Sequence, residues 1–324
     1  MPHREATAVA CANIAFIKYW GFRDEKLHLP LNNSISMNLA GIESITTVSL
    51  TNEHQDSLMI DGVPASQAAL SRASHFMDYI RAIAGTDERV SIVSNNNFPM
   101  GSGIASSASA FAALAVAASS LFELEMTEQD LSRLARLGSG SACRSIPAGY
   151  TEWLAGDSDQ TSYAISIASP ENWDLRDCIA VVNTQPKVVG SLAGHRAAET
   201  SPLQEGRIAS VLPRVEKCRS AIFNHDFWAL ADVIELDSNM MHAVMLTSTP
   251  MLFYWEPESI LVMKSVQKWR KNGIPCAFTV DAGPNIHVIC PAEAQNEVIH
   301  HLEQLPGIQN ILTARPGQGA RLQN

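Results

Sequence analysis

The sequence predicts an α+β protein built as two lobes. Its 324 residues are 46% hydrophobic and 17% charged, which is enough apolar material for a sizeable core. The expected strands and helices do not alternate regularly, as they would in a doubly wound parallel sheet. A second run of strands and helices begins near residues 175 to 185, so we expect the lobes to be residues 1–180 and 181–324.

The first lobe is expected to begin with strands and continue with helices. Small apolar residues in ATAVACANIAFI and β-branched residues alternating in SITTVSLT favour strands within residues 1–60. Apolar residues at helical spacing predict a helix over 65–84 that ends before Gly85. RVSIVSNNNF then predicts a strand, which enters a glycine-serine turn and a long helix of small residues. A further helix, TEQDLSRLARLG, begins with a capping signature at Thr127 and ends at Gly138.

The second lobe is expected to contain three longer helices and three strands before a final helix. The sequence CIAVVNT predicts its first strand. Helices follow near 205–223, 226–245 and 256–272, then strands at CAFTVD and IHVIC, and a last helix at 291–303.

Charge and composition exclude several classes of function. The net charge of −10 argues against nucleic acid or an anionic membrane as the main partner. The opening MPHREATAVACANIAF lacks a signal-peptide pattern, and no apolar stretch is long enough to span a bilayer. Six scattered cysteines without a C-x-x-C pair make zinc unexpected and favour free thiols. We therefore expect a cytoplasmic protein that acts on small molecules.

The stretch FPMGSGIASSASAFAAL has the order strand, glycine-rich turn and helix, which is suited to binding phosphate. Gly101 and Gly103 allow the backbone to approach a ligand closely, and backbone N–H groups at the helix start attract an anion. Ser102, Ser106 and Ser107 add hydroxyl groups. The alternative is a plain loop before a core helix packed through alanine and serine. The turn lacks the lysine of a Walker A loop and the later acidic residue of a Rossmann site.

Four motifs carry a resemblance to a known family. FPMGSGIASSAS resembles the P-x-x-x-G-L-x-S-S-A phosphate loop of the GHMP kinase superfamily, with Ile104 in the usual leucine position. NIAFIKYWGFRDEKLHLPLNNSISMNL, SGSACRSIPAGYTEW and VDAGPNIHVI resemble diphosphomevalonate decarboxylases, in the same order and across both lobes.

The resemblance implies a two-lobed GHMP-kinase-like fold with a cleft between the lobes. It also implies ATP and Mg²⁺ as cofactors, in a reaction of the mevalonate pathway of isoprenoid biosynthesis. A tertiary alcohol is phosphorylated by ATP, and carbon dioxide and phosphate are then lost. On this basis the ATP-binding residues are Pro99, Gly101, Ser102, Gly103, Ser106 and Ser107, with Ser107 also reaching the metal.

Asp281 and Lys18 are the first two candidate catalytic residues. Asp281 follows a predicted strand and precedes a tight Gly-Pro turn, where a capping role is the alternative. The resemblance makes it the carboxylate that orients the reacting hydroxyl. Lys18 has apolar neighbours, so its ammonium would be costly to bury unless paired. It is expected to neutralise the reacting phosphate and Asp281, and a lysine reaching solvent from a strand edge is the alternative.

Arg144 is the third candidate, because a guanidinium can hold a carboxylate through two parallel hydrogen bonds. The resemblance implies that it fixes the carboxylate that is lost; an arginine that bridges two loops is the alternative. The resemblance also gives Tyr19 a contact with the substrate phosphate, whereas Trp20 is expected to be mainly structural. Further residues assigned to the substrate site are Gly21, Ser139, Gly140 and Ser141.

The sequence departs from the family pattern at the expected phosphate end of the substrate. The family motif K-Y-W-G-K has Phe22 in place of its second lysine here. The family element K-x-x-S-S-T-x-G-M is KVVGSLAGH, in which Lys187 and Ser191 are retained. Gly190, Leu192 and His195 replace serine, threonine and methionine. Each lost charge-assisted contact is worth roughly 1.5–3 kcal/mol.

These departures predict a substrate with one phosphate fewer, namely mevalonate 5-phosphate, which would give isopentenyl phosphate. Arg23, Lys187 and His195 remain to hold a single phosphate, with Arg72 as a weaker candidate. The alternative is that neighbouring residues compensate and mevalonate 5-diphosphate is used, giving isopentenyl diphosphate.

Two further hypotheses keep the fold but change the function. A mevalonate 3-kinase would phosphorylate the substrate without decarboxylation, although it would not need the carboxylate clamp of Arg144. An inactive sensor of the same fold would be expected to lack the phosphate loop or Asp281. Enzymes of this size are often homodimers, so we expect one here.

Overall fold

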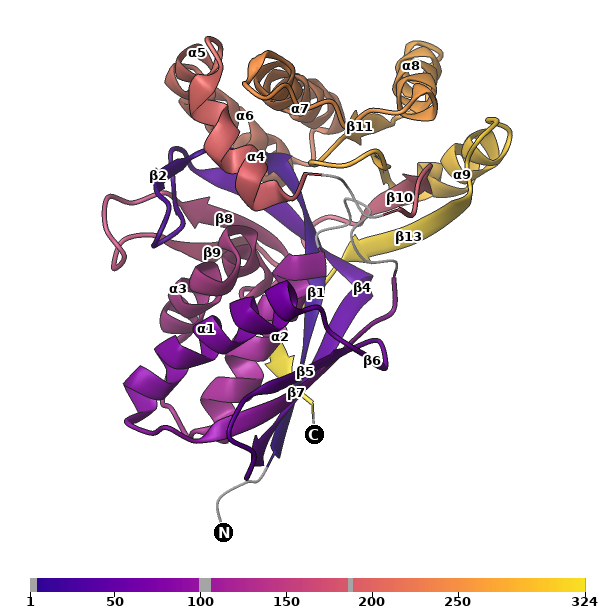
Figure 1. Ribbon diagram of the computed structural model, residues 1–324. Coiled ribbons are helices and arrows are strands. Elements are labelled where there is room, and N and C mark those ends of the chain that lie inside the picture. The colour runs from indigo at the N-terminus through magenta and orange to yellow at the C-terminus, as the bar shows by residue number, and fades with distance from the viewer. Residues whose placement is uncertain (1–4, 99–105, 186–188, 324) are drawn as a thin grey trace.

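The computed structural model describes residues 5–98, 106–185 and 189–323. A mixed sheet of twelve strands runs through this part of the chain, and helices cover it in two groups (Figure 1). The strands follow the order β11-β12-β10-β13-β4-β7-β5-β6, with β1, β14, β8 and β9 attached to this path. Among the described residues, no helix is long and apolar enough to cross a membrane.

The bounds of the elements are as follows. The strands of the sheet are β1 (Glu5–Ile17), β4 (Ser34–Thr51), β5 (Ser57–Ile60), β6 (Val63–Pro64), β7 (Arg89–Asn96), β8 (Tyr150–Leu154), β9 (Tyr163–Ala168), β10 (Leu175–Val181), β11 (Ala277–Thr279), β12 (Ile286–Pro291), β13 (Asn310–Pro316) and β14 (Arg321–Leu322). A separate small hairpin pairs β2 (Phe22–Asp24) with β3 (Leu29–Pro30). The helices are α1 (Gln67–Ala84), α2 (Ser106–Leu121), α3 (Glu128–Gly138), α4 (Ser191–Ala197), α5 (Gln204–Ala209), α6 (Val211–Asn224), α7 (Phe227–Thr247), α8 (Pro257–Lys271) and α9 (Gln295–Glu303).

Local signals in the N-terminal half form, most of them as predicted. Ser66 caps α1 through a bond from the N–H of Ala69, and Gly85 ends the helix in the left-handed conformation. Thr127 and Asp130 form the expected capping box at the start of α3. The small residues of α2 are almost all buried against the long antiparallel pair of β1 and β4, so this helix is the centre of the N-terminal core.

The C-terminal half differs from the predictions at several elements, and α4 was not expected at all. The single helix expected over 205–223 is two helices, α5 and α6, which break at Ser210. The Ser210 hydroxyl donates to the carbonyl groups of Gly206 and Arg207, competing with the helix pattern. The last helix, α9, begins at Gln295 after a short 3-10 turn, and it is followed by strands β13 and β14.

Strand β13 joins the two halves of the molecule. It pairs antiparallel with β10 of the second half and, through Arg315 and Pro316, with β4 of the first. The described chain begins and ends in the same region of the molecule, because β1 pairs antiparallel with β14 (Figure 1). Because one sheet continues through both halves, the segments after β1 and β11 are held close together.

Candidate active site

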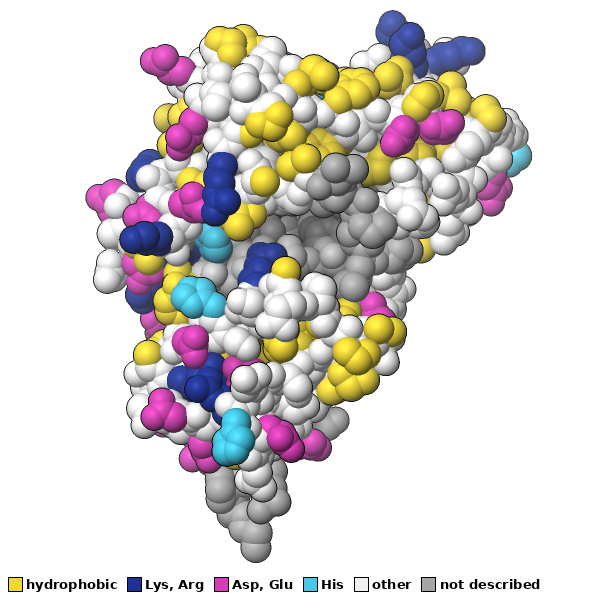
Figure 2. Space-filling model, viewed as in Figure 1, with side chains coloured by type: hydrophobic (Ala, Val, Ile, Leu, Met, Phe, Trp, Pro, Cys, Tyr) yellow, Lys and Arg dark blue, Asp and Glu magenta, His cyan; other side chains and the backbone are white. Residues whose placement is uncertain are grey.

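A cavity of about 350 Å³ lies where the two halves meet. Figure 2 shows the hollow, with histidine and basic side chains beside it. Residues predicted from six separate stretches of sequence line it: Lys18, Tyr19, Trp20, Phe22, Arg72, Ser106, Ser107, Ser139, Gly140, Ser141, Arg144, Gly190, Ser191, Leu192, His195 and Asp281.

Lys18 and Asp281 form an ion pair at one wall of the cavity. Lys18 follows β1 directly and is 1% exposed, and its Nζ lies 2.6 Å from Oδ1 of Asp281, which follows β11. Burial lowers the pKa of the Lys18 ammonium, and the carboxylate of Asp281 opposes that shift. Burial opposes ionisation of Asp281 as well, but the charge of Lys18 holds the pKa of this carboxyl below its ordinary value. The pair therefore presents an ionised carboxylate to a ligand.

Arg144 lies in the 3-10 turn Gly140–Ser145 and is almost fully buried. Its Nε and Nη2 donate to Oδ1 of Asn13 at 3.2 and 3.1 Å, and its Nη1 donates to Oγ of Ser34 at 2.8 Å. These bonds to described residues use three of the five N–H groups of the guanidinium. Two N–H groups remain for a ligand that enters the cavity. This number matches a carboxylate, which can accept two parallel hydrogen bonds from a guanidinium.

Asn13 is a site residue that sequence reasoning missed. Its side chain is buried, accepts from Arg144, and donates from Nδ2 to Oγ of Ser145 at 2.8 Å. A lone amide inside the small apolar strand ATAVACANIAFI was the signal that could have identified it, since a buried polar group requires partners.

Four rings pack together at the other wall, and we call this group the ring wall: Tyr19, Trp20, Phe22 and His195. The His195 ring lies 4.1 Å from Tyr19, 4.4 Å from Trp20 and 4.9 Å from Phe22 between centroids. The N–H of Gly21 donates to Nδ1 of His195 at 3.0 Å, so a neutral His195 ring carries its proton on Nε2. Burial raises the pKa of Tyr19 well above its ordinary value, which keeps the phenol a neutral donor.

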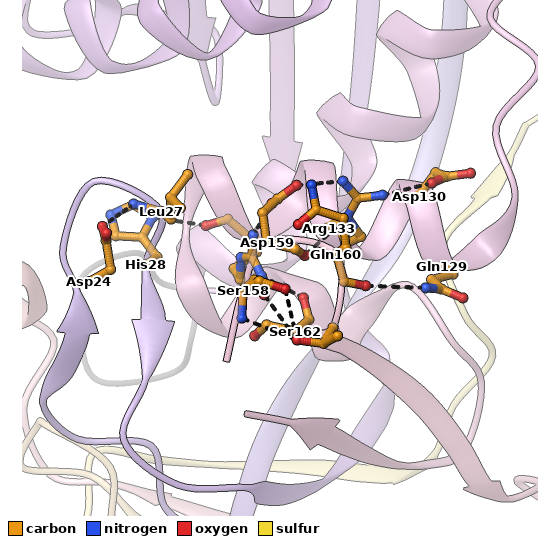
Figure 3. A network of polar contacts seen from close by, with 12 residues as sticks. Asp24, Leu27, His28, Gln129, Asp130, Arg133, Ser158, Asp159, Gln160 and Ser162 are labelled. Atoms are coloured by element: carbon orange, nitrogen blue, oxygen red, sulfur yellow. Dashed lines mark hydrogen bonds and ion pairs between the residues drawn. The ribbon is translucent and has the colours of Figure 1, made fainter. Parts of the chain in front are cut away.

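His28 also lines the cavity and was not predicted. Its Nδ1 bonds to the carbonyl of Arg136 at 2.9 Å, and its ring lies 5.7 Å from that of Phe22. Arg133 and Arg136 both pair with Asp159. Figure 3 shows Arg133, Asp159 and His28 in this network. This network fixes α3, and through Arg136 it fixes His28. No local sequence pattern marks His28, because its position depends on that distant packing.

One predicted substrate residue lies apart from the described cavity, and its contact with the substrate stays a prediction. Arg23 does not line the cavity, and its guanidinium donates instead to the carbonyl of Gly156. Neighbouring residues of a strand point to opposite faces, so the buried Phe22 turns Arg23 outward. Gly21 contributes its N–H to His195 from behind the cavity wall. The predicted residues Pro99, Gly101, Ser102, Gly103 and Lys187 lie outside the described residues.

Arg72 and the serines at the start of α2 stand between this cavity and a second one. Arg72 donates from Nε and Nη2 to the carbonyl of Gly138 at 3.1 and 2.7 Å, and Oγ of Ser107 lies 3.3 Å from Oγ of Ser139. The second cavity, of about 180 Å³, shares Arg72, Ser106 and Ser107 with the first. Its other walls are mostly apolar: Leu58, Ile60, Ile92, Ala110, Phe111 and Leu114, with Ser94 and Asn96.

The fold and the site define an enzyme of GHMP-kinase-like architecture. Its two adjoining cavities suit two small-molecule ligands, and an ion pair and a buried arginine lie in the larger cavity. Two family models match the chain. The diphosphomevalonate decarboxylase-like N-terminal domain matches residues 10–164, and the mevalonate 5-diphosphate decarboxylase C-terminal domain matches residues 178–319.

Individual relatives agree with these matches. The diphosphomevalonate decarboxylase of Candida albicans is 38% identical over 331 aligned residues, covering 95% of this chain and 91% of the relative. The crystal structure of mevalonate diphosphate decarboxylase from Staphylococcus aureus is 38% identical, with a TM-score of 0.93 over 99% of this chain and 98% of that one. A structure of MDDEF in complex with MVAPP, AMPPCP and magnesium is 35% identical, with a TM-score of 0.93 over 99% of both chains.

The chain belongs to the diphosphomevalonate decarboxylase family. The predicted family, fold class and enzyme class are confirmed.

Proposed function

We propose that this protein catalyses the ATP-dependent decarboxylation of mevalonate 5-phosphate to isopentenyl phosphate, through phosphorylation of the 3-hydroxyl group. The observation that carries the choice of a monophosphate is the position of Phe22, whose ring is 7% exposed and lines the cavity. The reaction class itself is supported by the family and by the arrangement of Lys18, Asp281 and Arg144.

Each group of the site has a role in this reaction. The carboxylate of Asp281 accepts a hydrogen bond from the 3-hydroxyl and orients it in line with the transferred phosphoryl group. The ammonium of Lys18 stabilises the charge that develops there. The two available N–H groups of Arg144 hold the substrate carboxylate. As the C–O bond to phosphate breaks, the electrons of the C–carboxylate bond form the alkene, and carbon dioxide leaves.

The nucleotide is proposed to occupy both cavities. The apolar walls of the smaller cavity suit a purine ring, and the first turn of α2 separates it from the larger one. ATP with Mg²⁺ supplies the phosphoryl group and neutralises its charge. The described residues hold no cluster of three or more acidic, histidine or cysteine ligands. Mg²⁺ usually takes most of its ligands from phosphate and water, so the two hydroxyl groups of Ser107 and Ser139 are a suitable contribution from the protein.

Phe22 limits the negative charge that the cavity can accept beside its ring. Its ring packs against Tyr19, His28 and His195 and is held by these contacts. A terminal phosphate placed there would meet aromatic carbon, and its desolvation would be uncompensated. Besides Lys18 and Arg144, the basic side chains that line the described cavity are Arg72, His28 and His195. We propose that these hold one phosphate.

A second candidate substrate is mevalonate 5-diphosphate, with isopentenyl diphosphate as the product. The comparisons support it more directly, because the relatives named above are diphosphomevalonate decarboxylases and one structure contains MVAPP. A 3-kinase without decarboxylation is the third hypothesis. The N–H groups of Arg144 that described residues leave available favour a decarboxylase over it.

The test compares the two substrates at equal ATP and excess magnesium, because the diphosphate itself binds the metal. We expect kcat/KM for mevalonate 5-phosphate to exceed that for the diphosphate by at least ~10-fold, or about 1.4 kcal/mol. The variant Phe22→Lys, alone or with Leu192→Thr, should narrow or reverse this ratio. Phe223→Lys on the exposed face of α6 is the matched control and should leave it unchanged.

Two outcomes would favour the other candidates. Equal or better turnover of the diphosphate by the unmodified protein would refute the monophosphate proposal and establish the second candidate. ADP formation without carbon dioxide would establish the 3-kinase. We also propose a cytoplasmic homodimer in which residues 1–180 bind the nucleotide and residues 181–324 carry Asp281; light scattering of the purified protein tests the dimer.

A further inference from the structure

One helix, α7, contacts the main chain beside both members of the Lys18–Asp281 pair. Oδ2 of Asp237 accepts the backbone N–H of Lys18 at 2.6 Å. On the same helix, Oγ of Ser238 accepts the N–H of Val280 at 3.0 Å, and Nε2 of His242 lies 3.3 Å from the Val280 carbonyl. Val280 directly precedes Asp281.

The spacing on α7 explains how one helix reaches two strand ends. Ser238 and His242 are four residues apart and share a face, which lies against the segment after β11. Asp237 is one residue earlier and is turned toward the end of β1. The helix packs on both β1 and β11, so the two contacts are made by one rigid element.

All three side chains are buried and have defined hydrogen-bond roles. Asp237 and Ser238 are 0% exposed and His242 is 3% exposed. Burial, together with the nearby charge of Lys18, lowers the pKa of His242 to about 4, so the ring is neutral at physiological pH. With the Val280 carbonyl as its partner, Nε2 is the nitrogen that carries the proton. The ring also stacks on Trp255, with centroids 4.7 Å apart.

Two buried arginines complete the hold on the Lys18 main chain. Nε of Arg214 donates to Oδ1 of Asp237 at 2.7 Å and balances its charge. Nη2 of Arg207 donates to the carbonyl of Lys18 at 2.7 Å. Lys18 is therefore held at both its N–H and its C=O. Buried charges of this kind add little net stability, so precise placement is the better explanation for them.

We propose that Asp237, Ser238 and His242 are positioning residues, which hold Lys18 and Asp281 at the separation that phosphoryl transfer needs. This inference rests on the proposed function, since it concerns the rate of that reaction. A displacement of about 1 Å in a reacting group can reduce turnover by ~10²-fold, so loosening either main-chain contact should lower kcat. Binding of the substrates should change little, because none of the three lines the cavity.

The first variants are Ser238→Ala and His242→Leu, which remove the contacts to Val280. We expect each to lower kcat by ~10-fold or more, with KM for ATP and for the phosphorylated mevalonate within about twofold of wild type. His242→Gln keeps an N–H donor near the position of Nε2 and should recover most of the rate. If these residues only stabilised the fold, kcat would not fall while KM stays unchanged, and glutamine at position 242 would not restore kcat.

Glu235→Gln is the matched control on the same helix. Glu235 is also buried, but it pairs with Arg270 and accepts the N–H of Phe278 on β11 rather than binding the main chain of Lys18 or Val280. We expect this variant to lower the melting temperature and to keep kcat within about twofold at a temperature where it is folded.

The outcomes separate this inference from the proposed function. A wild-type protein that neither forms ADP nor releases carbon dioxide refutes the proposed function, and the inference falls with it. An active wild type with Ser238→Ala and His242→Leu variants that keep kcat within twofold refutes the inference alone. An equal loss of kcat in Glu235→Gln also refutes it, because any disturbance of α7 would then have the same effect.

Discussion

Replacing Arg144 with lysine tests the carboxylate clamp most directly. The arginine uses three N–H groups on Asn13 and Ser34 and keeps two for a ligand. Lysine keeps the positive charge but can offer one hydrogen bond in place of the parallel pair. The loss of one charge-assisted bond is worth about 1.5–3 kcal/mol, so we expect kcat/KM for carbon dioxide release to fall roughly 10- to 150-fold.

The assay measures ADP formation and carbon dioxide release in the same reaction. In the proposed mechanism phosphoryl transfer depends on Lys18 and Asp281, so ADP formation should fall less than carbon dioxide release does. The ratio of carbon dioxide to ADP should then drop below one. Arg81→Lys is a suitable control, because Arg81 is also buried and ion-paired, with Asp56 and Asp78, but lies on α1 away from the cavity.

The result that would refute this reasoning is a variant with wild-type carbon dioxide release. It would mean that another group holds the carboxylate and that Arg144 serves only to join Asn13 on β1 to Ser34 on β4. A parallel fall in both products would place the effect of Arg144 before phosphoryl transfer.

Three further predictions address the remaining groups. Asp281→Asn should stay folded and bind ATP but lose at least ~10²-fold in turnover, and a rate within threefold of wild type would remove Asp281 from the mechanism. Ser107→Ala should weaken ATP–magnesium use more than binding of the mevalonate substrate, and calorimetry showing the reverse would contradict the ATP assignment. The pKa of His242 is lowered to about 4, so the unfolded state binds its proton first and stability should fall as pH drops from about 6.5 to 4. His242→Gln should remove up to about 3 kcal/mol of this acid sensitivity in urea titrations, and unchanged sensitivity would assign it elsewhere.

The parts of the fold predicted best are those that depend on local signals. The signals at Gly85 and Thr127 are short-range, so the end of α1 and the start of α3 could be placed from the sequence, whereas the cap at Ser66 was not predicted. Strand β13 was missed because its partner β4 lies more than 250 residues earlier. The break at Ser210 was missed as well, because a single serine that bonds to its own helix carries no strong sequence signal.

In the candidate site, too, the sequence indicated several individual residues but gave little information on their contacts. Lys18 was expected to be costly to bury unless paired, and the pairing with Asp281 confirms that interpretation against the solvent-facing alternative. Arg144 does bridge, through three of its donors, and its role as a clamp stays a prediction that the two other donors allow. The lone amide of Asn13 could be noticed in the sequence, but the contacts of Asn13 and His28 arise only through tertiary packing and could not.

Phe22 stands in place of the family's lysine and His195 in place of its methionine. These two replacements are not independent of each other. The ring of His195 packs against Tyr19, Trp20 and Phe22, and its Nδ1 is held by the N–H of Gly21. A lysine at 22 would remove one face of this packing, and a methionine at 195 would remove the acceptor for Gly21. Energies of residues in direct contact do not add, so summing a separate penalty for each lost family residue overstates the effect. The ring wall is better treated as one unit that replaces charge by aromatic surface. That unit, rather than Phe22 alone, is what excludes a second phosphate in the proposed reaction.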